Sequence, residues 1–394
     1  MNRNSDQGQR AKSRILLYSH KNIYDQDVWR CPFREFETIL QEVDAVDVLA
    51  PAPKPSYSRG KRVAMRIGEF VPLPINPGVP VTKIEGEYDL FITVCEKVSE
   101  LLHMKALQGV KDKCKKTVCW IPEFYFKDIP LYKSCVEVLK QFDYVIFMFA
   151  ANEPFKAILT CPNQYLPAGI DTLNFCPYPN PPARSIDVLS IGRRAPATHN
   201  ALLKMAREDG KFYVYDTIDA LNGYNLEEHR LMIANMAKRS RYFIVSPGKF
   251  DRPEETGGVS EFGYRYFEAA SAGTLMIGMR PFNNPEFDKI FTWRDAVLEV
   301  PFTTDEIVSV IHEFDKEPER QMKARHTNIT QCLRNHDWVY RWESVLKLVG
   351  MEPLPMLEKR KRVLSELAAL VDKDFSGRHA AQDGASLLSA GRVK

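Results

Sequence analysis

The sequence predicts an α/β protein with two Rossmann-like domains, each built around a parallel sheet, and a helical C-terminal extension. Three observations predict this class. The chain has 394 residues, which is more than one hydrophobic core usually serves. Short, continuously apolar segments alternate with amphipathic helical segments, as is typical of strands buried on both faces of a parallel sheet. The alternation stops at a proline-rich stretch, residues 165–185, and then starts again.

The first half contains five segments of apolar, β-branched or aromatic residues. We expect strands at 14–19, 46–51, 89–94, 117–121 and 144–149. Helical patterns occur between several of these segments, at 33–43, 97–107 and 131–142. Residues 51–82 are rich in proline and too long for an ordinary connection, so we expect a functional surface excursion there.

The second half repeats the pattern and ends in helices. Its expected strands are 187–192, 211–216, 242–247, 275–279 and 296–300. Helical patterns separate or follow them, at 200–209, 227–239, 304–316, 318–334, 337–349 and 356–371. A further helix is expected within the segment "GGVSEFGYRYFEAASAGTLMIG", residues 257–278, which runs directly into a strand.

These patterns divide the chain into five parts. We expect an N-terminal Rossmann-like domain at 1–170, a linker at 171–186 and a C-terminal Rossmann-like domain at 187–350. A helix at 351–375 is expected to cross back to the N-terminal domain, and the Ser/Gly/Ala-containing tail at 376–394 to be disordered.

Composition excludes several classes of protein. The net charge of +3 gives no support for a nucleic-acid binder. The eight cysteines show neither a CxxC pair nor the spacing of metal ligands, so we expect free, buried thiols and no metal site. Residues 1–13 have no apolar core of a secretory signal, and the longest apolar run, 144–151, is too short to cross a bilayer. We therefore expect a cytoplasmic protein.

Three motifs, in a fixed order, resemble a known family. "PAGIDTLNFCP" (167–177) resembles the "PNGVDxxxFxP" segment between the domains of retaining, nucleotide-sugar-dependent glycosyltransferases of the GT-B fold. "LSIGRR" (189–194) resembles the strand and "GR" turn that open their donor domain. "FIVSP" (243–247) followed by "EFGYRYFEAASAGTLMIG" (261–278) resembles their "EGFGxxxxEAMAxGxPVI" block, in a form close to the CgeB-like branch.

The resemblance implies a GT-B fold in which two Rossmann-like domains face a central cleft. It implies transfer of a sugar from a nucleoside diphosphate to an acceptor hydroxyl, with retention of configuration and without a metal. Retaining transfer on this fold is drawn with the acceptor attacking from the leaving-group side, so a conventional protein base is not expected. The acceptor is not specified and includes anionic glycans, lipid-linked molecules and small molecules.

Two residues are expected to carry the chemistry. Arg193 follows a glycine at a strand end, where a planar guanidinium is suited to grip two oxygens of the leaving diphosphate. The resemblance assigns Glu268 to the two ribose hydroxyls, and its place early in a helix that points at the cleft would keep it ionised without a partner cation. The alternatives are a solvated Arg193 and a capping or salt-bridged Glu268.

Further donor contacts are expected nearby. Glycines permit close approach of the backbone and a helix start attracts anions, while cations hold phosphates. The family's additional glutamate would lie eight residues before Glu268, at Ser260, and the adjacent acid is Glu261. The complete set is Gly192, Arg194, Lys249, Arg252, Gly257, Gly258, Ser260, Glu261, Gly263 and Arg265.

Acceptor and membrane contacts are expected elsewhere. His20, at the end of the first strand, is a candidate for the acceptor side, although a lone histidine is more often structural. Basic residues within 54–66 are candidates for steering an acidic acceptor, such as a phosphorylated lipid or an anionic polymer. The "EKRKR" run at 358–362 is a candidate for peripheral contact with the inner face of a membrane. Two other functions stay open: a catalytically silent GT-B subunit used for binding or scaffolding, and a sugar-nucleotide-modifying enzyme such as an epimerase.

Overall fold

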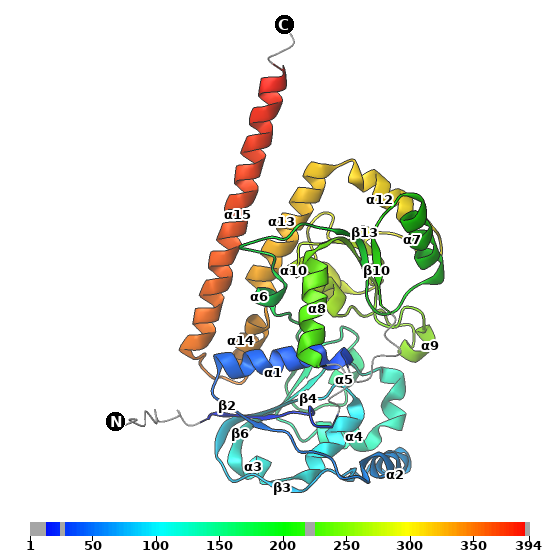
Figure 1. Ribbon diagram of the computed structural model, residues 1–394. Helices are drawn as coiled ribbons and strands as arrows, with labels where there is room; N and C mark the ends of the chain where they lie inside the picture. Colours follow the sequence, from blue (N-terminus) through cyan, green and yellow to red (C-terminus); the bar gives the residue numbers. More distant parts are fainter. Residues whose placement is uncertain (1–12, 24–27, 217–224, 391–394) are drawn as a thin grey trace, which may run out of the picture. The chain divides into compact units, whose positions relative to one another are not determined.

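The computed structural model describes residues 13–23, 28–216 and 225–390, with side chains as far as residue 377 (Figure 1). The chain forms two compact units. The first contains residues 1–167 and 342–357, and the second contains 168–341 and 358–394. The segment that returns to the first unit is therefore 342–357, whereas the sequence suggested 351–375.

The first unit is built on a six-stranded parallel sheet with the order β2-β1-β4-β6-β7-β8. Its strands are β1 Ile15–Tyr18, β2 Val46–Leu49, β4 Tyr88–Val94, β6 Cys114–Ile121, β7 Tyr144–Phe147 and β8 Asn163–Tyr165. All five expected strands are confirmed. The short β8 was not expected, because "NQY" lacks the apolar character of a buried strand and is only half-buried.

Helices and a minor strand pair complete this unit. The helices are η1 Val28–Arg30, α1 Cys31–Val43, α2 Tyr57–Phe70, η2 Val98–Ala106, α3 Val110–Lys113, η3 Phe126–Leu131, α4 Lys133–Leu139, α5 Glu153–Lys156 and α14 Trp338–Leu348, whose first residues belong to the second unit. The small parallel pair consists of β3 Thr82–Lys83 and β5 Leu107–Gln108. Residues 98–106 form a 3₁₀ helix where we expected an α-helix.

The proline-rich excursion contains an unexpected helix, α2. Its buried stripe is short and small, with Tyr57, Ala64 and Gly68. A Cβ at Gly68 would lie 2.2 Å from the hydroxyl oxygen of Ser134 in α4, so glycine allows the two helices to approach closely. Because the rest of α2 is polar or exposed, apart from the half-buried Met65, its sequence did not show the wide apolar stripe of a core helix.

The second unit is built on a five-stranded parallel sheet with the order β10-β9-β11-β12-β13. The strands are β9 Ile186–Ser190, β10 Tyr213–Tyr215, β11 Ser240–Val245, β12 Leu275–Gly278 and β13 Leu298–Glu299, and all five were expected. The helices are α6 Thr172–Phe175, α7 Pro196–Glu208, α8 Leu226–Lys238, α9 Pro253–Thr256, α10 Tyr264–Ser271, α11 Pro285–Ile290, α12 Ile307–Asp315, α13 Pro318–Asn335 and most of α15 Pro355–Ala390.

Helices cover both faces of this second sheet. α7 packs with α12, and α10 packs with α8 and α13. Adjacent strand residues such as Val188 and Leu189 are both fully buried, which explains why the strands read as continuous apolar runs. The chain leaves β9 towards β10 but leaves β11 towards β12, so the direction of winding reverses between β9 and β11. These features confirm the GT-B fold class, with two Rossmann-like parallel-sheet domains and C-terminal helices.

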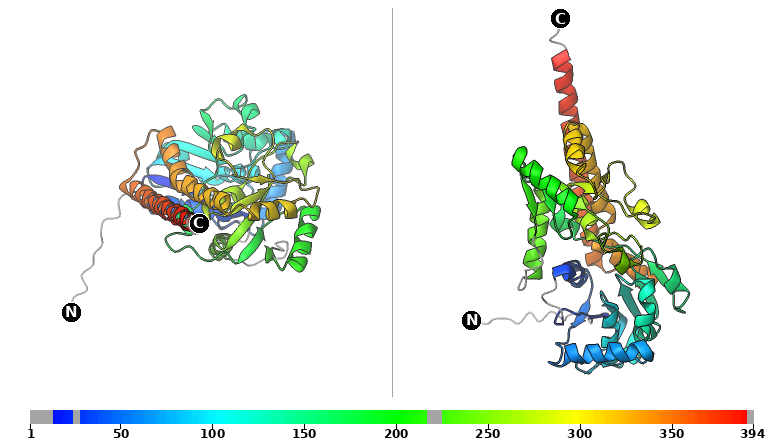
Figure 2. Two further views of the ribbon diagram at one scale, coloured as in Figure 1. Left: turned by 90° about the horizontal axis from the view of Figure 1, so that it is seen from above. Right: turned by 90° about the vertical axis from the view of Figure 1, so that its right-hand side faces the viewer.

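The last helix, α15, runs beside α13 (Figures 1 and 2). Asp372 of α15 lies 2.7 Å from His326 of α13, and the ring of Phe375 stacks on the same histidine at 4.2 Å between centroids. α15 continues to Ala390, where we expected a disordered tail; residues 391–394 of that tail lie outside the described residues. Within the described part of the chain, no helix combines the length and apolar character needed to span a bilayer.

Candidate functional site

The loops at the carboxyl edge of the second sheet contain most of the expected site residues. Residues 191–195 follow β9, Asp216 follows β10, and residues 246–263 follow β11 and lead into α10. In open parallel sheets, ligands bind outside the carboxyl ends of the strands, where the winding reverses. The loops after β9 and β11 flank that point.

Arg193 joins these two loops. Its Nη1 atom lies 3.1 Å from each carboxylate oxygen of Asp251, and both side chains are more than a third exposed. Arg193 thus stands at the reversal point, as expected, but it is paired with an acid in this structure. Because the pair is exposed, it stabilises the fold by only about 0–1 kcal/mol.

The neighbouring residues Gly192 and Arg194 are held by Asp216. Gly192 has φ +95°, which favours glycine, and its N–H donates to Asp216 Oδ1 at 2.9 Å. Arg194 donates to the same oxygen at 3.2 Å and to the Asp216 carbonyl, and its guanidinium lies over the Tyr215 ring. Arg194 therefore fastens the loop after β9 to the end of β10.

Glu268 is buried and doubly paired, which corrects two expectations. It is the fifth residue of α10, only 1% exposed, and each carboxylate oxygen accepts from a different guanidinium, that of Arg230 in α8 or that of Arg265 in α10 itself. Burial raises the pKa of Glu268, but the charges of Arg265 and Arg230 outweigh it and hold that pKa below its usual value. The carboxylate is ionised because of partner cations, and it has no open face. The salt-bridged alternative describes Glu268 in this structure.

Arg265 connects the Glu268 pair to the loop edge. Its side chain is 30% exposed, compared with 7% for Arg230. Burial raises the pKa of Asp216, while the Gly192 N–H and the nearby charge of Arg265 act in the opposite direction. Arg265 is therefore the outermost member of a buried acid–base cluster and lies close enough to Asp216 to affect it.

A second set of charges lies on the loop after β11. Lys249 lies 3.7 Å and Arg252 2.9 Å from Glu255. The hydrogen bond from Arg252, followed by the charges of Arg252, Lys249 and Arg193, lowers the pKa of Glu255. Gly257 and Gly258 have φ of +65° and +79°. Both glycines follow the four-residue α9 and precede α10 by several residues. They were expected directly before the start of a helix, but they shape the loop instead.

Ser260, Glu261 and Gly263 form the last part of this loop. Asn284, after β12, donates to the Ser260 carbonyl at 2.9 Å and to Glu261 Oε2 at 3.1 Å. Gly263 is the residue that precedes the first turn of α10. The contacts of Ser260 and Glu261 fix the loop against the segment after β12, so they have a structural role in this structure.

His20 lies in the first unit, at the carboxyl edge of its sheet. It is 2% exposed, and its Nδ1 lies 3.0 Å from Nδ1 of His103, whose Nε2 lies 2.8 Å from the Tyr57 hydroxyl. Burial lowers the pKa of both histidines well below the usual value. His20 is thus a buried, neutral member of a hydrogen-bonded chain and does not line an open acceptor surface.

One group of side chains in the described residues has the composition of a metal site. Ligand atoms of His20, Cys95 and Glu100 lie within 4.8 Å of one another. However, Glu100 Oε1 pairs with Arg30, and Oε2 accepts from the Glu96 N–H at 2.9 Å. Burial raises the pKa of Cys95, which keeps the thiol protonated. The group is best described as a buried polar network. All eight cysteines are free thiols, and seven are buried, as expected.

The structure adds three site residues that the sequence did not reveal: Arg230, Asp216 and Asp251. Arg230 lies 38 positions before Glu268 in a different helix, so only tertiary packing brings them together. Asp216 ends a predicted strand, and a polar residue at a strand end was a feature of the sequence that could have indicated it as a site residue. Arg193 and Glu268 were expected to converge, but within the described residues they belong to separate clusters and share no partner.

Solved structures with a similar fold include glycosyltransferases. One similar structure is an alpha-glucosyltransferase in complex with UDP and a 13-mer DNA containing a central A:G mismatch. Its TM-score with this chain is 0.52 at 10% sequence identity, and the match covers 86% of this chain and 99% of that one. A glycosyltransferase from Rickettsia africae gives 0.44 at 11% identity, covering 86% and 98%, and a Methanocaldococcus jannaschii UDP-GlcNAc 2-epimerase gives 0.40 at 11%, covering 86% and 100%. Scores below 0.5 carry no argument. The first likeness, at its low identity, shows the fold alone.

Comparison by sequence gives a match only to a family model. No curated protein sequence matches this chain. Residues 203–347, which include α8, the loop after β11 and α10, match a family model described as "Glycosyl transferase-like". Together with the GT-B fold, this match supports a glycosyltransferase.

Proposed function

We propose that this protein transfers a sugar from a nucleoside diphosphate to an acceptor hydroxyl, with retention of configuration and without a metal. One observation carries the proposal: exposed and half-buried cations surround the reversal point of the sheet whose domain contains the family match. Arg193, Lys249, Arg252 and Arg265 all lie on the loops there or at the first turns of α10.

These cations match the charge that develops in the reaction. The bond between the anomeric carbon and the diphosphate oxygen breaks, the bond to the acceptor oxygen forms, and the acceptor proton goes to the departing phosphate. Guanidinium groups stabilise the leaving diphosphate by charge-assisted, often bidentate hydrogen bonds. Because the Arg193–Asp251 pair is exposed and weak, a diphosphate can replace the carboxylate of Asp251 at little cost.

We assign Glu268 a positioning role in this proposal. Both of its oxygens are engaged by guanidinium groups, so it orients Arg265 towards the loop edge while Arg230 balances the remaining charge. A direct bond to the ribose hydroxyls would need one guanidinium to move away. Binding of the nucleoside alone, compared with the diphosphate, separates these two roles.

We further propose that the protein works at the cytoplasmic face of a membrane, through the exposed face of α2. Val63, Ile67 and Phe70 are exposed there, at 52, 37 and 76%. Three exposed arginines share the helix: Arg59, Arg62 and Arg66. A helix that exposes both apolar and basic side chains is typical of binding to an anionic lipid surface, which suits a lipid-linked acceptor.

Calorimetry with UDP, GDP, ADP and dTDP tests the donor proposal. Heat of binding with at least one of them is expected, and no heat with any of the four would overturn it. A second candidate function is that of a catalytically inactive GT-B subunit. It is favoured by the burial of Glu268 and by the sequence "APATHN" after Arg194, because the family that this chain resembles has a lysine there. Slow hydrolysis of the sugar donor without acceptor, measured by product chromatography, would argue against a silent subunit.

A further inference from the structure

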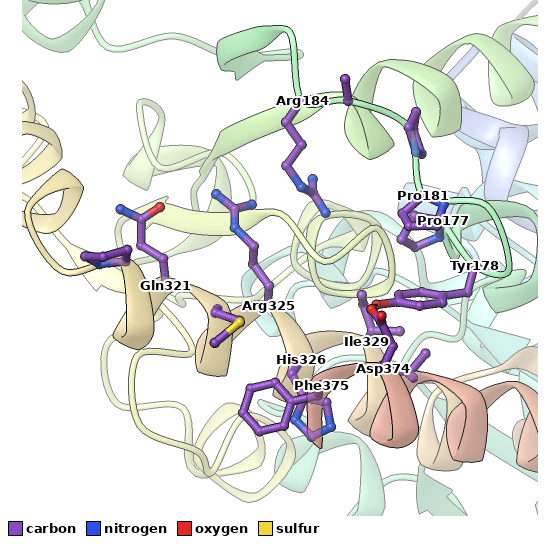
Figure 3. Close-up of a pocket in the computed structure, with 15 residues that line it drawn as sticks. Pro177, Tyr178, Pro181, Arg184, Gln321, Arg325, His326, Ile329, Asp374 and Phe375 are labelled. Carbon is purple, nitrogen blue, oxygen red and sulfur yellow. The ribbon is translucent and has the colours of Figure 1, made fainter. Parts of the chain in front are cut away.

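A pocket lies in the second unit, at the amino edge of its sheet. The candidate donor site, on the loops after β9 and β11, lies at the opposite, carboxyl edge. The pocket has a volume of about 450 Å³ and is enclosed by the linker before β9, by α13 and by α15 (Figure 3). Arg184 marks its position: this residue lies two places before β9, and it donates to the carbonyls of Ser240, the first residue of β11, and Ala272, just before β12, at 2.6 and 2.9 Å. None of the proposed donor residues lines this pocket.

Two arginines converge in the pocket, and in the described residues neither forms a salt bridge with an acid. Figure 3 shows Arg184 extending from the linker and Arg325 from α13 towards each other. Arg325 donates to the carbonyl of Gly273 at 3.2 Å. In the described ranges, neither guanidinium lies within salt-bridge distance of a carboxylate, and both have only backbone oxygens as partners.

Three backbone carbonyls partly offset the two positive charges, and a bound anion would offset them further. Burial lowers the pKa of Arg184 to about 10, and burial together with repulsion from Arg184 lowers the pKa of Arg325. Guanidinium groups stay charged in proteins, so the two positive charges remain half-buried side by side. An anion with two negative charges would neutralise both and use the N–H donors that face the pocket.

Much of the rest of the wall is apolar or aromatic. It includes Ile329, Phe375 and the proline-rich linker with Pro177 and Pro181. Tyr178 donates to Asp374 at the side of the pocket that faces α15 (Figure 3). The acidic group there disfavours a second anionic group on the ligand but can accept a hydrogen bond from a ligand hydroxyl. A volume of this size lies in the lower part of the range for small-molecule pockets, so it can hold a small ligand.

We propose that this pocket binds a small phosphomonoester, with the phosphate between Arg184 and Arg325 and the apolar body against the prolines and Phe375. This site is separate from the donor site and does not depend on the proposed reaction. Its ligand would join the linker, α13 and α15, so that the amide hydrogens of these segments exchange more slowly when the site is occupied.

Phenyl phosphate is the probe, because it combines a dianionic phosphate with an apolar ring. In calorimetry with the full chain, it is expected to bind more tightly than either inorganic phosphate or phenol. Arg325→Met is expected to weaken binding at least about tenfold, the loss that follows removal of a charged hydrogen-bond partner. The matched control is Arg207→Met, an exposed arginine of α7 in the same unit, and it should bind phenyl phosphate as the wild type does.

Several results would overturn the proposal. These are no binding of phenyl phosphate at millimolar concentration, equal losses in Arg325→Met and Arg207→Met, and displacement of phenyl phosphate by the nucleoside diphosphates. If Arg325→Met fails to fold, Met322→Glu serves instead, since it puts a negative charge at the pocket wall without altering either arginine. Binding that survives Met322→Glu would also contradict the proposal. Hydrogen exchange locates the site: protection by phenyl phosphate is expected at 318–335 and 371–375.

Discussion

Arg193 Nη1 lies 3.1 Å from both carboxylate oxygens of Asp251, and this pair connects the loops that follow β9 and β11. The two strands flank the point where the winding of the second sheet reverses. An acid therefore occupies the position at which a diphosphate is expected to bind. The pair neutralises the charge of Arg193, and it makes Asp251 a competitor of the ligand.

The first prediction concerns this competition. Arg193→Ala should weaken binding of the nucleoside diphosphate about 10- to 100-fold, because a charge-assisted hydrogen-bond partner is lost. Asp251→Asn should strengthen binding, since it frees the guanidinium without removing it. Calorimetry at low salt measures both effects. Equal weakening by the two substitutions would contradict the role assigned to Arg193.

The second prediction separates two roles of Glu268. If this carboxylate positions Arg265, Glu268→Gln should weaken binding of the diphosphate and leave binding of the free nucleoside unchanged. If it bonds to ribose, both ligands should lose affinity to a similar extent. Arg265→Met is the matched variant, and it should reproduce the loss for the diphosphate. Calorimetric titration of each variant with the two ligands decides between the roles.

Glu268 also supports a prediction about stability. Removal of one partner from a buried ion pair leaves the other charge uncompensated, at a cost of about 3–5 kcal/mol. Glu268→Ala should therefore lower the free energy of unfolding by roughly this amount in urea titrations. Glu255→Ala, which removes an exposed acid, should change it by less than about 1 kcal/mol. A small effect of Glu268→Ala would mean that the two arginines find other partners.

The fourth prediction concerns pH and His336. This side chain is 6% exposed, and burial followed by the charge of Arg341 lowers its pKa well below the usual value. The unfolded chain takes up a proton near pH 6.5, and the folded chain does not, so the stability that neutral His336 provides is present above this pH and is lost as the pH falls. The difference in unfolding free energy between wild type and His336→Gln should shrink by about 1 kcal/mol between pH 7.5 and 5.5. A difference that stays constant would contradict the assignment.

The fifth prediction tests the membrane surface. Phe70→Ser should reduce co-sedimentation with vesicles of anionic phospholipid, because Phe70 is the most exposed of the apolar residues of α2. The control is Phe126→Ser, an exposed phenylalanine of the same unit, 55% exposed, outside α2. Vesicles of neutral lipid should bind the wild type more weakly, since the arginines of α2 then lack an anionic partner. Binding that is independent of both Phe70 and lipid charge would exclude this surface.

The strands and most of the helices of both units could be predicted from local sequence patterns. All ten expected strands occur, because a strand buried on both faces must be apolar throughout and is therefore visible locally. The helix α2 was missed because its buried side is narrow, consisting of Tyr57, Ala64 and Gly68. The order and position of Gly192, Arg193 and the α10 block also placed the candidate site on the second unit, since these residues follow strand ends.

The contacts of the site residues, in contrast, depend on how the elements pack and could not be predicted from the sequence. Glu268 lies between Arg230 and Arg265, Arg193 opposite Asp251, and Gly192 against Asp216. Apart from Arg265, these partners are between 24 and 58 positions away in the chain, and no local pattern encodes such a distance. Hydrophobic periodicity specifies which side of an element is buried, whereas the pairing of charges depends on how the elements pack. For the same reason, the convergence of Arg184 and Arg325 became visible only in the folded chain.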